Sequence, residues 1–128
     1  MRKRSPDKMR PPKIRICEDK HLSLNRTVLR LIGKPRNIQF WWSEHENMLL
    51  VGGSEAKTPQ SFSVTDFYYD NSHSESLKIS RKRLIDMIFS RADLDNNYIY
   101  TVYGSYIPGL NMVGFKVYEA DLEVGIDE

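Results

Sequence analysis

The chain has 128 residues and a mass of 15.0 kDa, which suits a single domain or two small repeats that share one core. Apolar residues make up 40% of it and aromatic residues 11%, so the chain is not disordered throughout. Neither an apolar run of the roughly 20 residues that a membrane helix needs nor a secretion signal is visible. A single cysteine, Cys17, excludes an intramolecular disulfide and a multi-cysteine zinc site. We therefore expect a soluble, cytoplasmic protein that has no membrane partner.

The net charge of +2 hides a segregation of charge along the chain. Residues 1–16 have a net charge of +6, whereas the remaining 112 residues have a net charge of −4. Two basic clusters, 20–36 and 78–91, lie within that remainder, and the segment 119–128 carries only acidic charges. A basic arm with two basic patches is typical of proteins that bind a phosphate backbone, although basic tails also serve simply as solubilising ends.

The first half of the chain predicts a short helix between strands. Residues 1–12 are polar, basic and interrupted by three prolines, which indicates a disordered arm. Asn25 is the expected N-cap of the helix, and Gly33 is its expected end. The expected elements are strands over 13–17 and 21–24, a helix over 26–32, and a hairpin of strands over 38–42 and 48–51.

The second half predicts the same order of elements. They are a strand over 62–65, a long polar loop over 66–76, a strand over 77–79, a helix from 81 to about 92, and β-rich arms over 98–103 and 112–118 joined by a turn over 104–111. Ser80 is the expected N-cap of the second helix. At an offset of 55, three of the four apolar positions of Leu22–Leu29 coincide with those of Leu77–Leu84.

These patterns predict an α+β fold built from an internal repeat. Two tandem β-β-α-β-β units, 13–53 and 61–121, would pack as a pseudo-dimer, because neither half can bury its apolar face alone. Their strands would form a barrel-like sheet with two short helices. The single domain would then span 13–121, between the basic arm and an acidic tail over 122–128.

The first unit resembles the swapped-hairpin domain of the AbrB and MraZ transcription regulators. The segments that occupy matching places are Ile14–Ile16, Leu22–Asn25, Val28–Gly33, Ile38–Phe40 and Met48–Val51. Two tandem units in one chain resemble MraZ, whose halves form a pseudo-dimer. Residues 22–51 are also similar to short uncharacterised proteins of Gram-positive bacteria, a likeness that implies no known activity.

The resemblance implies DNA binding by basic residues of the first hairpin and of the helix starts. Mapped onto this chain, those residues are Arg15, Lys20, His21 and Arg26 in the first unit and Lys78, Arg81 and Lys82 in the second. Independently of the resemblance, two basic patches related by a repeat are suited to contacting two stretches of phosphates. We therefore expect a small, non-catalytic DNA-binding regulator or accessory factor.

Signatures of catalysis or metal binding are weak in this sequence. The three histidines stand apart in polar settings, without the spacing that places two ligands on one helix face. Cys17 ends a predicted strand, where a small buried side chain is a better interpretation than a nucleophile. Two Glu-x-Lys triplets, at 18–20 and 55–57, leave a metal-dependent nuclease as a weak third option. We therefore expect no enzyme, no metal and no cofactor.

The aromatic residues leave a second function open. Trp41 and Trp42 are adjacent on a predicted strand, so they must face opposite sides of the sheet. The tyrosines of the second half, together with the aromatic run at 67–69, suit three roles: stacking on single-stranded nucleic acid, a homo-oligomer interface, or plain cross-strand packing. The tyrosines meant are Tyr98, Tyr100, Tyr103 and Tyr106. The alternative function is thus a protein-interaction or oligomerisation module that uses an exposed aromatic strand surface.

Overall fold

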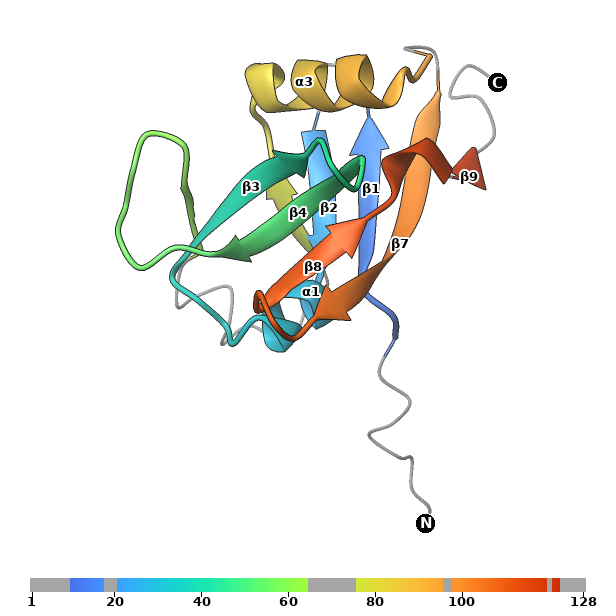
Figure 1. The fold of residues 1–128 in the computed structure, drawn as a ribbon. Coiled ribbons are helices and arrows are strands. Elements are labelled where there is room, and N and C mark those ends of the chain that lie inside the picture. Colours follow the sequence, from blue (N-terminus) through green and yellow to red (C-terminus); the bar gives the residue numbers. More distant parts are fainter. Residues whose placement is uncertain (1–9, 18–20, 65–75, 96–97, 120, 123–128) are drawn as a thin grey trace.

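The computed structural model is an antiparallel barrel-like sheet with two helices, and it describes residues 10–17, 21–64, 76–95, 98–119 and 121–122 (Figure 1). The strands are β1 (Lys13–Cys17), β2 (His21–Asn25), β3 (Asn37–Ser43), β4 (Met48–Gly53), β5 (Phe62–Ser63), β6 (Ser76–Ile79), β7 (Ile99–Ile107), β8 (Met112–Phe115) and β9 (Asp121–Leu122). The helices are α1 (Arg26–Leu31), α3 (Lys82–Ala92) and a short 3-10 helix, η2 (Val117–Glu119). The α+β class and the barrel-like sheet that the sequence predicts are therefore confirmed.

The strands follow one hydrogen-bonded path, β5-β3-β4-β8-β7-β1-β2-β6, with β9 beside β7. Strand β7 is long enough to pair with its two neighbours in succession: residues 99–103 pair with β1, and residues 104–107 pair with β8. The strand passes from one partner to the other at Gly104. A Cβ atom there would lie 2.7 Å from the carbonyl oxygen of Gly114 and 2.7 Å from the ring of Phe115, so only glycine fits.

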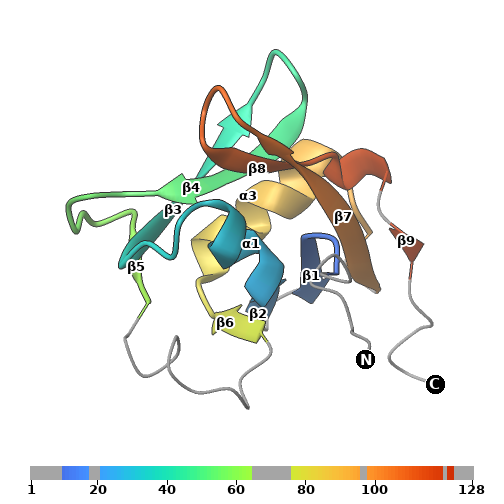
Figure 2. The same cartoon turned by 90° about the horizontal axis from the view of Figure 1, so that it is seen from below.

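A single core fills the barrel. Figures 1 and 2 show that α1 and α3 lie at opposite ends of the barrel, where they cover its two openings. The largest fully buried side chains are Phe115, Ile14, Ile16, Leu22, Leu24, Leu29, Ile38, Leu49, Ile85, Ile88, Val28 and Val51. Both halves contribute to this set, so each half completes the core of the other.

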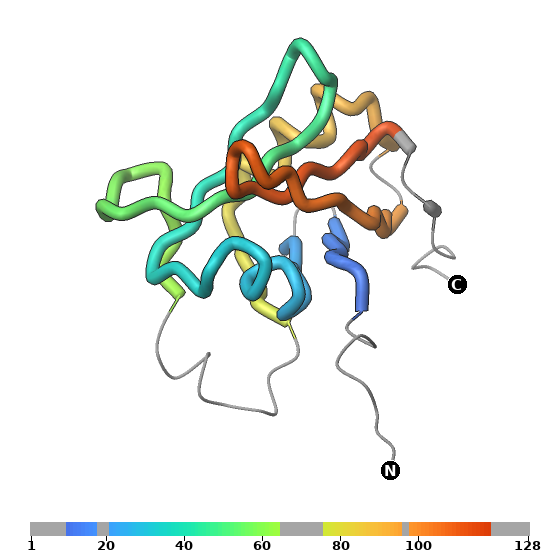
Figure 3. Tube along the Cα trace, turned by 60° about the horizontal axis from the view of Figure 1, so that its bottom comes forward, coloured from blue at the N-terminus to red at the C-terminus, as the bar shows by residue number. Residues whose placement is uncertain are grey.

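The order β-β-α-β-β occurs twice, and the counterparts are β1 and β5, β2 and β6, α1 and α3, β3 and β7, and β4 and β8. Exchanging every strand for its counterpart reproduces each pairing of the path except β1–β2. In the β2–β6 pair, Ser23 lies opposite Lys78, which is the counterpart that the offset of 55 assigns to it. Figure 3 shows these two segments, distant in sequence, side by side.

The two hairpins also correspond in detail. The last pair of β3–β4 is Ser43 with Met48, and the last pair of β7–β8 is Ile107 with Met112. Each four-residue turn ends in an asparagine in the left-handed region, with φ of 56° at Asn47 and 55° at Asn111. The hairpins therefore match at an offset of 64 instead of 55, and the greater length of α3, which has 11 residues against six in α1, accounts for more than half of the difference.

Several predicted boundaries are wrong, most of them by one or two residues. Arg81, not Ser80, is the N-cap of α3, and neither Arg81 nor Asn25 makes a side-chain capping hydrogen bond. The segment 104–111 is not all turn, because β7 continues to Ile107 through its ladder with β8. The last strand ends at Phe115, where η2 follows, rather than at 118.

Residues 1–9 of the arm expected over 1–12, residues 65–75, and the tail from 123 lie outside the described residues. Pro11 and Pro12, which were expected in the disordered arm, are hydrogen-bonded to Asn25 and Gly104, and Ser76, which was expected in the loop, begins β6.

Among the helices that the structure describes, none is long and apolar enough to cross a membrane.

Candidate nucleic-acid interface

The outer surface of β1, β2 and β6 is basic. Alternation along each strand sends one set of side chains into the core and the other set outward. In register, Ser23 of β2 lies between Arg15 of β1 and Lys78 of β6, so these two cations flank one serine on the outer surface. Three strands that are separate in sequence therefore combine their polar residues on one side of the barrel.

This surface is hollowed. A pocket of about 390 Å³ is lined by Arg10, Lys13, Arg15, His21, Ser23, Asn25, Ser76 and Lys78, which we call the basic face. Four of the eight residues are Lys or Arg, one is His, and none of these described lining residues is a carboxylate. Such a surface attracts phosphate, because each cation that meets a phosphate releases condensed counterions from the nucleic acid.

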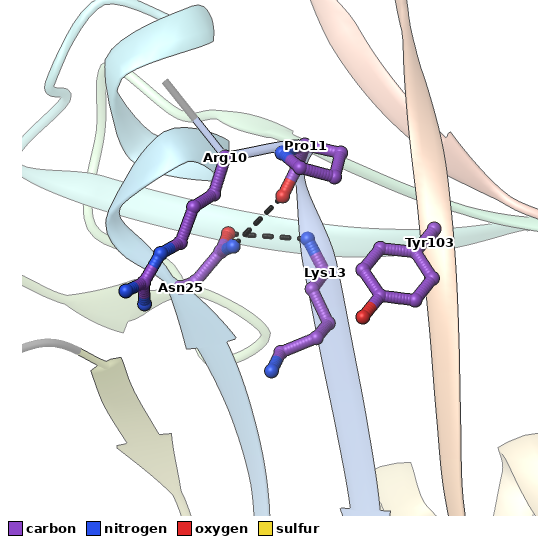
Figure 4. A pocket seen from close by; sticks show the side chains of 5 residues that line it. All are labelled: Arg10, Pro11, Lys13, Asn25 and Tyr103. Atoms are coloured by element: carbon purple, nitrogen blue, oxygen red, sulfur yellow. Dashed lines mark hydrogen bonds between the residues drawn. The ribbon is translucent and has the colours of Figure 1, made fainter. Parts of the chain in front are cut away.

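A notch adjoins the basic face and shares three residues with it. The notch has a volume of about 280 Å³ and is lined by Arg10, Pro11, Lys13, Asn25 and Tyr103 (Figure 4). Lys13 and Tyr103 lie opposite each other in the β1–β7 pair, so the tyrosine stands beside the basic face. The side chain of Tyr103 is 55% exposed.

Asn25 fixes the chain at this place instead of capping α1. Its Oδ1 accepts a hydrogen bond from the backbone N–H of Lys13 at 3.1 Å, and its Nδ2 donates one to the carbonyl oxygen of Pro11 at 2.9 Å (Figure 4). The carbonyl oxygen of Pro12 accepts a further hydrogen bond from the N–H of Gly104 at 2.9 Å. The start of β1 is thus attached to both neighbouring strands, and the notch has a defined wall.

The structure brings together three of the seven residues expected to bind nucleic acid, Arg15, His21 and Lys78. Arg26 and Arg81 lie elsewhere, just beyond opposite ends of the β2–β6 pair, because Arg26 follows Asn25 and Arg81 follows Ile79 by two residues. At ~3.4 Å per residue, the register places the two arginines about 20 Å apart along the strands. Lys20 lies outside the described residues.

Arg81 and Lys82 have local structural contacts. The guanidinium carbon of Arg81 lies 4.4 Å from the centroid of the Phe62 ring, and its Nη1 lies 3.5 Å from the carbonyl oxygen of Pro59. Arg81 therefore connects the segment after β6 to the segment around β5, the two ends of the strand path. Lys82 pairs with Asp86 one turn further along α3, at 3.3 Å, in an exposed ion pair of the kind that contributes little to stability.

Sequence reasoning missed five residues of the basic face: Arg10, Lys13, Ser23, Asn25 and Ser76. Lys13 could have been found, because it lies two positions before Arg15 on a predicted strand and so shares its face. Asn25 was assigned only to capping. Ser76 had no signal, since its place on this surface depends on the pairing of β6 with β2, which joins distant segments.

A second outer surface, on the opposite hairpins, is apolar. The outward side chains Trp41, Met48, Leu50, Ile107 and Met112, which we call the apolar face, are each half-buried. They fold over two glycines: a Cβ on Gly52 would lie 2.9 Å from Met112 Cγ, and one on Gly114 would lie 2.6 Å from Met48 Sδ. Trp42 packs on the core instead, as expected for its alternate position.

The tyrosines divide between packing and exposure. Tyr100 is buried, stacks edge-on with Phe89 at 5.9 Å between centroids, and donates its hydroxyl to the carbonyl oxygen of Asp95. Tyr98 and Tyr106 are half-buried and packed against the core. These three tyrosines therefore serve in packing. Tyr103 is the member of the expected group whose ring is exposed. The aromatic run at 67–69 lies outside the described residues.

Sites for metal chemistry were also compared with the structure. The described residues contain no group of three or more His, Cys, Asp and Glu side chains that could hold a metal ion. Glu55 lines a separate hollow of about 460 Å³ together with Arg36 and the turn of the second hairpin. Cys17 is buried, as its position on the strand predicted.

Comparison with known proteins gives no relative for this arrangement. No protein-family model matches the chain, and neither a curated protein nor a solved structure matches it. The function therefore has to be inferred from the surfaces themselves.

Proposed function

We propose that the protein binds DNA through the basic face, as a small non-catalytic regulator or accessory factor. The observation that carries the proposal is the pocket on β1, β2 and β6, where the described lining residues include four that are Lys or Arg and one His, but no carboxylate. Phosphate contacts from such residues supply most of the sequence-independent affinity of DNA-binding proteins. Arg26 and Arg81, about 20 Å apart, would extend the contact to both ends of β2–β6.

We also infer that the two halves form a pseudo-dimer of the swapped-hairpin kind. The matching pairings, the Ser23–Lys78 register and the equivalent left-handed asparagines support this inference. The basic face would then lie across the pseudo-two-fold axis, which suits a duplex whose own strands are related by two-fold symmetry. The resemblance of residues 13–53 to the AbrB and MraZ regulators points to the same kind of ligand.

The proposal is tested by fluorescence-anisotropy titration of a mixed duplex at two salt concentrations. Lys78→Ala removes an exposed cation from the basic face, and Lys116→Ala removes an exposed lysine that follows β8 as the matched control. Lys78→Ala is expected to weaken binding and to reduce the salt slope by about 1, as for the loss of one phosphate contact. Equal slopes for wild type, Lys78→Ala and Lys116→Ala would overturn the assignment of this face.

The basic arm needs a separate test, because it could bind DNA by itself. Residues 1–9 carry four Lys and Arg against one Asp, a net charge of +3. A protein that lacks residues 1–9 is expected to bind the duplex more weakly but still in a salt-sensitive way. Complete loss of binding would place the DNA contact on the arm and not on the barrel.

A second candidate function, self-association, is favoured by the apolar face. Apolar side chains gathered on an outer sheet surface are typical of contacts between protein molecules. Sedimentation velocity over a range of concentrations is expected to reveal a dimer that is insensitive to salt, and Leu50→Lys, at the centre of the face, is expected to shift it to monomer. A wild-type protein that is monomeric throughout would exclude this function.

A further inference from the structure

The notch beside the basic face has the features of a site for a single planar ring. Tyr103 forms one side of it, and the pyrrolidine ring of Pro11 lies on another side (Figure 4). At 55% exposure, Tyr103 is one of the most exposed large apolar side chains that the structure describes. An exposed tyrosine ring is a surface on which any nucleobase can stack, since every base has a π-face.

The size of the notch suits one base rather than a base pair. A volume of about 280 Å³ corresponds to about nine water molecules at ~30 Å³ each, which is room for one planar base. The stacked base pairs of an intact duplex keep their faces covered, so a ring can enter the notch only from an unpaired nucleotide.

The charges around the notch are placed for the backbone of the same nucleotide. Arg10 and Lys13 line both the notch and the basic pocket, so the two hollows adjoin at these residues. A strand whose base stacks on Tyr103 would therefore have its neighbouring phosphates on the basic face. Asn25 holds Pro11 and Lys13 by its two hydrogen bonds, which keeps the wall of the notch in place before a ligand arrives.

We propose that the notch between Pro11 and Tyr103 binds an unpaired nucleobase, so that the protein prefers DNA with a single-stranded end or gap next to a duplex. This inference rests on the proposed function, because the basic face supplies the phosphate contacts on either side of the base. It names the ligand more closely: a junction between paired and unpaired DNA, rather than a uniform duplex.

The experiment uses three labelled probes with the full chain: a blunt duplex, the same duplex with a short thymidine overhang, and the same duplex with an abasic overhang of equal length. The abasic probe has the extra phosphates but no bases. The thymidine overhang is expected to bind about 5- to 100-fold more tightly than the abasic one, the range that stacking of one base gives.

Variants at exposed tyrosines assign the effect to the notch. Tyr103→Ala is expected to abolish the preference for bases and to leave binding of the blunt duplex unchanged, whereas Tyr103→Phe keeps the ring and the preference. Tyr118→Ala is the matched control, since Tyr118 is 46% exposed and lies on η2, away from the notch. Unchanged circular dichroism verifies that each variant folds.

The outcomes distinguish a failure of the base site from a failure of the proposed DNA binding through the basic face. If the thymidine and abasic overhangs bind equally, or if Tyr103→Ala keeps the difference between them, the base site is wrong while salt-sensitive binding of the blunt duplex still supports the basic face. If none of the probes binds, both the base site and the proposed function are wrong.

Discussion

The outer surfaces of β2–β6 and of β4–β8 differ in chemistry, although each is an antiparallel pair of strands that hold the same place in the two β-β-α-β-β runs. In the pseudo-dimer that we propose, both pairs would lie on the two-fold axis. On the first, the central pair is Ser23 with Lys78; on the second, it is Leu50 with Gly114. One surface is therefore basic and hollow, and the other is apolar and covered by its own side chains.

This difference shows that the residue types of the core and those of the outer surfaces are under separate constraints in this barrel. The inward positions of both pairs are aliphatic or aromatic throughout, because both face the same interior. The outward positions are not constrained by that interior, so β2 and β6 have Ser, His and Lys where β4 and β8 have Leu, Met and Gly. Function should accordingly be sought on the outward positions, and the predictions below test how independent the two surfaces are.

The largest effect on stability is expected at Gly104, where β7 passes from its pairing with β1 to its pairing with β8. Gly104→Ala would place a Cβ against the Gly114 carbonyl and the Phe115 ring, both at 2.7 Å, and we expect a loss of about 1–3 kcal/mol in the free energy of unfolding. Gly109→Ala is the control, because a Cβ there meets nothing within 4 Å. Urea denaturation measures both variants; equal stability of the two would show that β7 does not need its close approach at Gly104.

A smaller effect is expected at the edge of the basic face. Asn25→Ala removes two hydrogen bonds that hold residues 11 and 13, and we expect it to cost about 1 kcal/mol in the free energy of unfolding. Because those bonds fix the start of β1, hydrogen exchange at the N–H of Lys13 should accelerate as well. Ser23→Ala, on the same face of β2, is the control; exchange that stays slow in Asn25→Ala would contradict the anchoring role.

The smallest effect is expected where the two ends of the strand path meet. Arg81→Ala removes the cation from the face of the Phe62 ring at 4.4 Å, for an expected loss of about 0.5 kcal/mol at this exposed site. Arg83→Ala is the control: it removes an exposed arginine two residues further along the chain, in α3, and is expected to leave the melting temperature unchanged. A thermal scan compares them, and an equal melting temperature for both would show that the contact of Arg81 with the Phe62 ring does not stabilise the fold.

Most strand positions and the start of α1 were predictable from the sequence, whereas the end of β7 and the contacts of the cap residues were not. The alternation of Ile14 and Ile16 located β1 to the residue, because one face of that strand is wholly buried. The turn predicted over 104–111 begins only after Ile107, because β7 continues through Gly104, where the absence of a side chain permits the close contact with Phe115. Asn25 is a residue type that often caps helices, yet its side chain forms hydrogen bonds with the backbone of Pro11 and Lys13 instead.

The basic residues were predictable individually, whereas their assembly was not. Arg15, His21 and Lys78 were selected through the resemblance to the AbrB and MraZ regulators, which implies contacts by basic residues of the first hairpin and of the helix starts. The β1–β2–β6 pairing brings these three residues together. Arg81 was selected by the same reasoning, but its contact with Phe62 depends on how the two ends of the barrel approach each other. Tyr103 could not be separated from Tyr100 by sequence, because their difference in burial follows from the face of β7 that each occupies.

The sequence by itself determined the order of elements, the apolar positions of the core and the positive charge of the first and middle segments, because these depend on local periodicity and composition. Only the tertiary structure decided which charges become neighbours. A register between β2 and β6 joins residues more than 50 positions apart, and local patterns have no information about such pairings. The basic face exists because of that register, and the notch exists because the β1–β7 register places Tyr103 opposite Lys13.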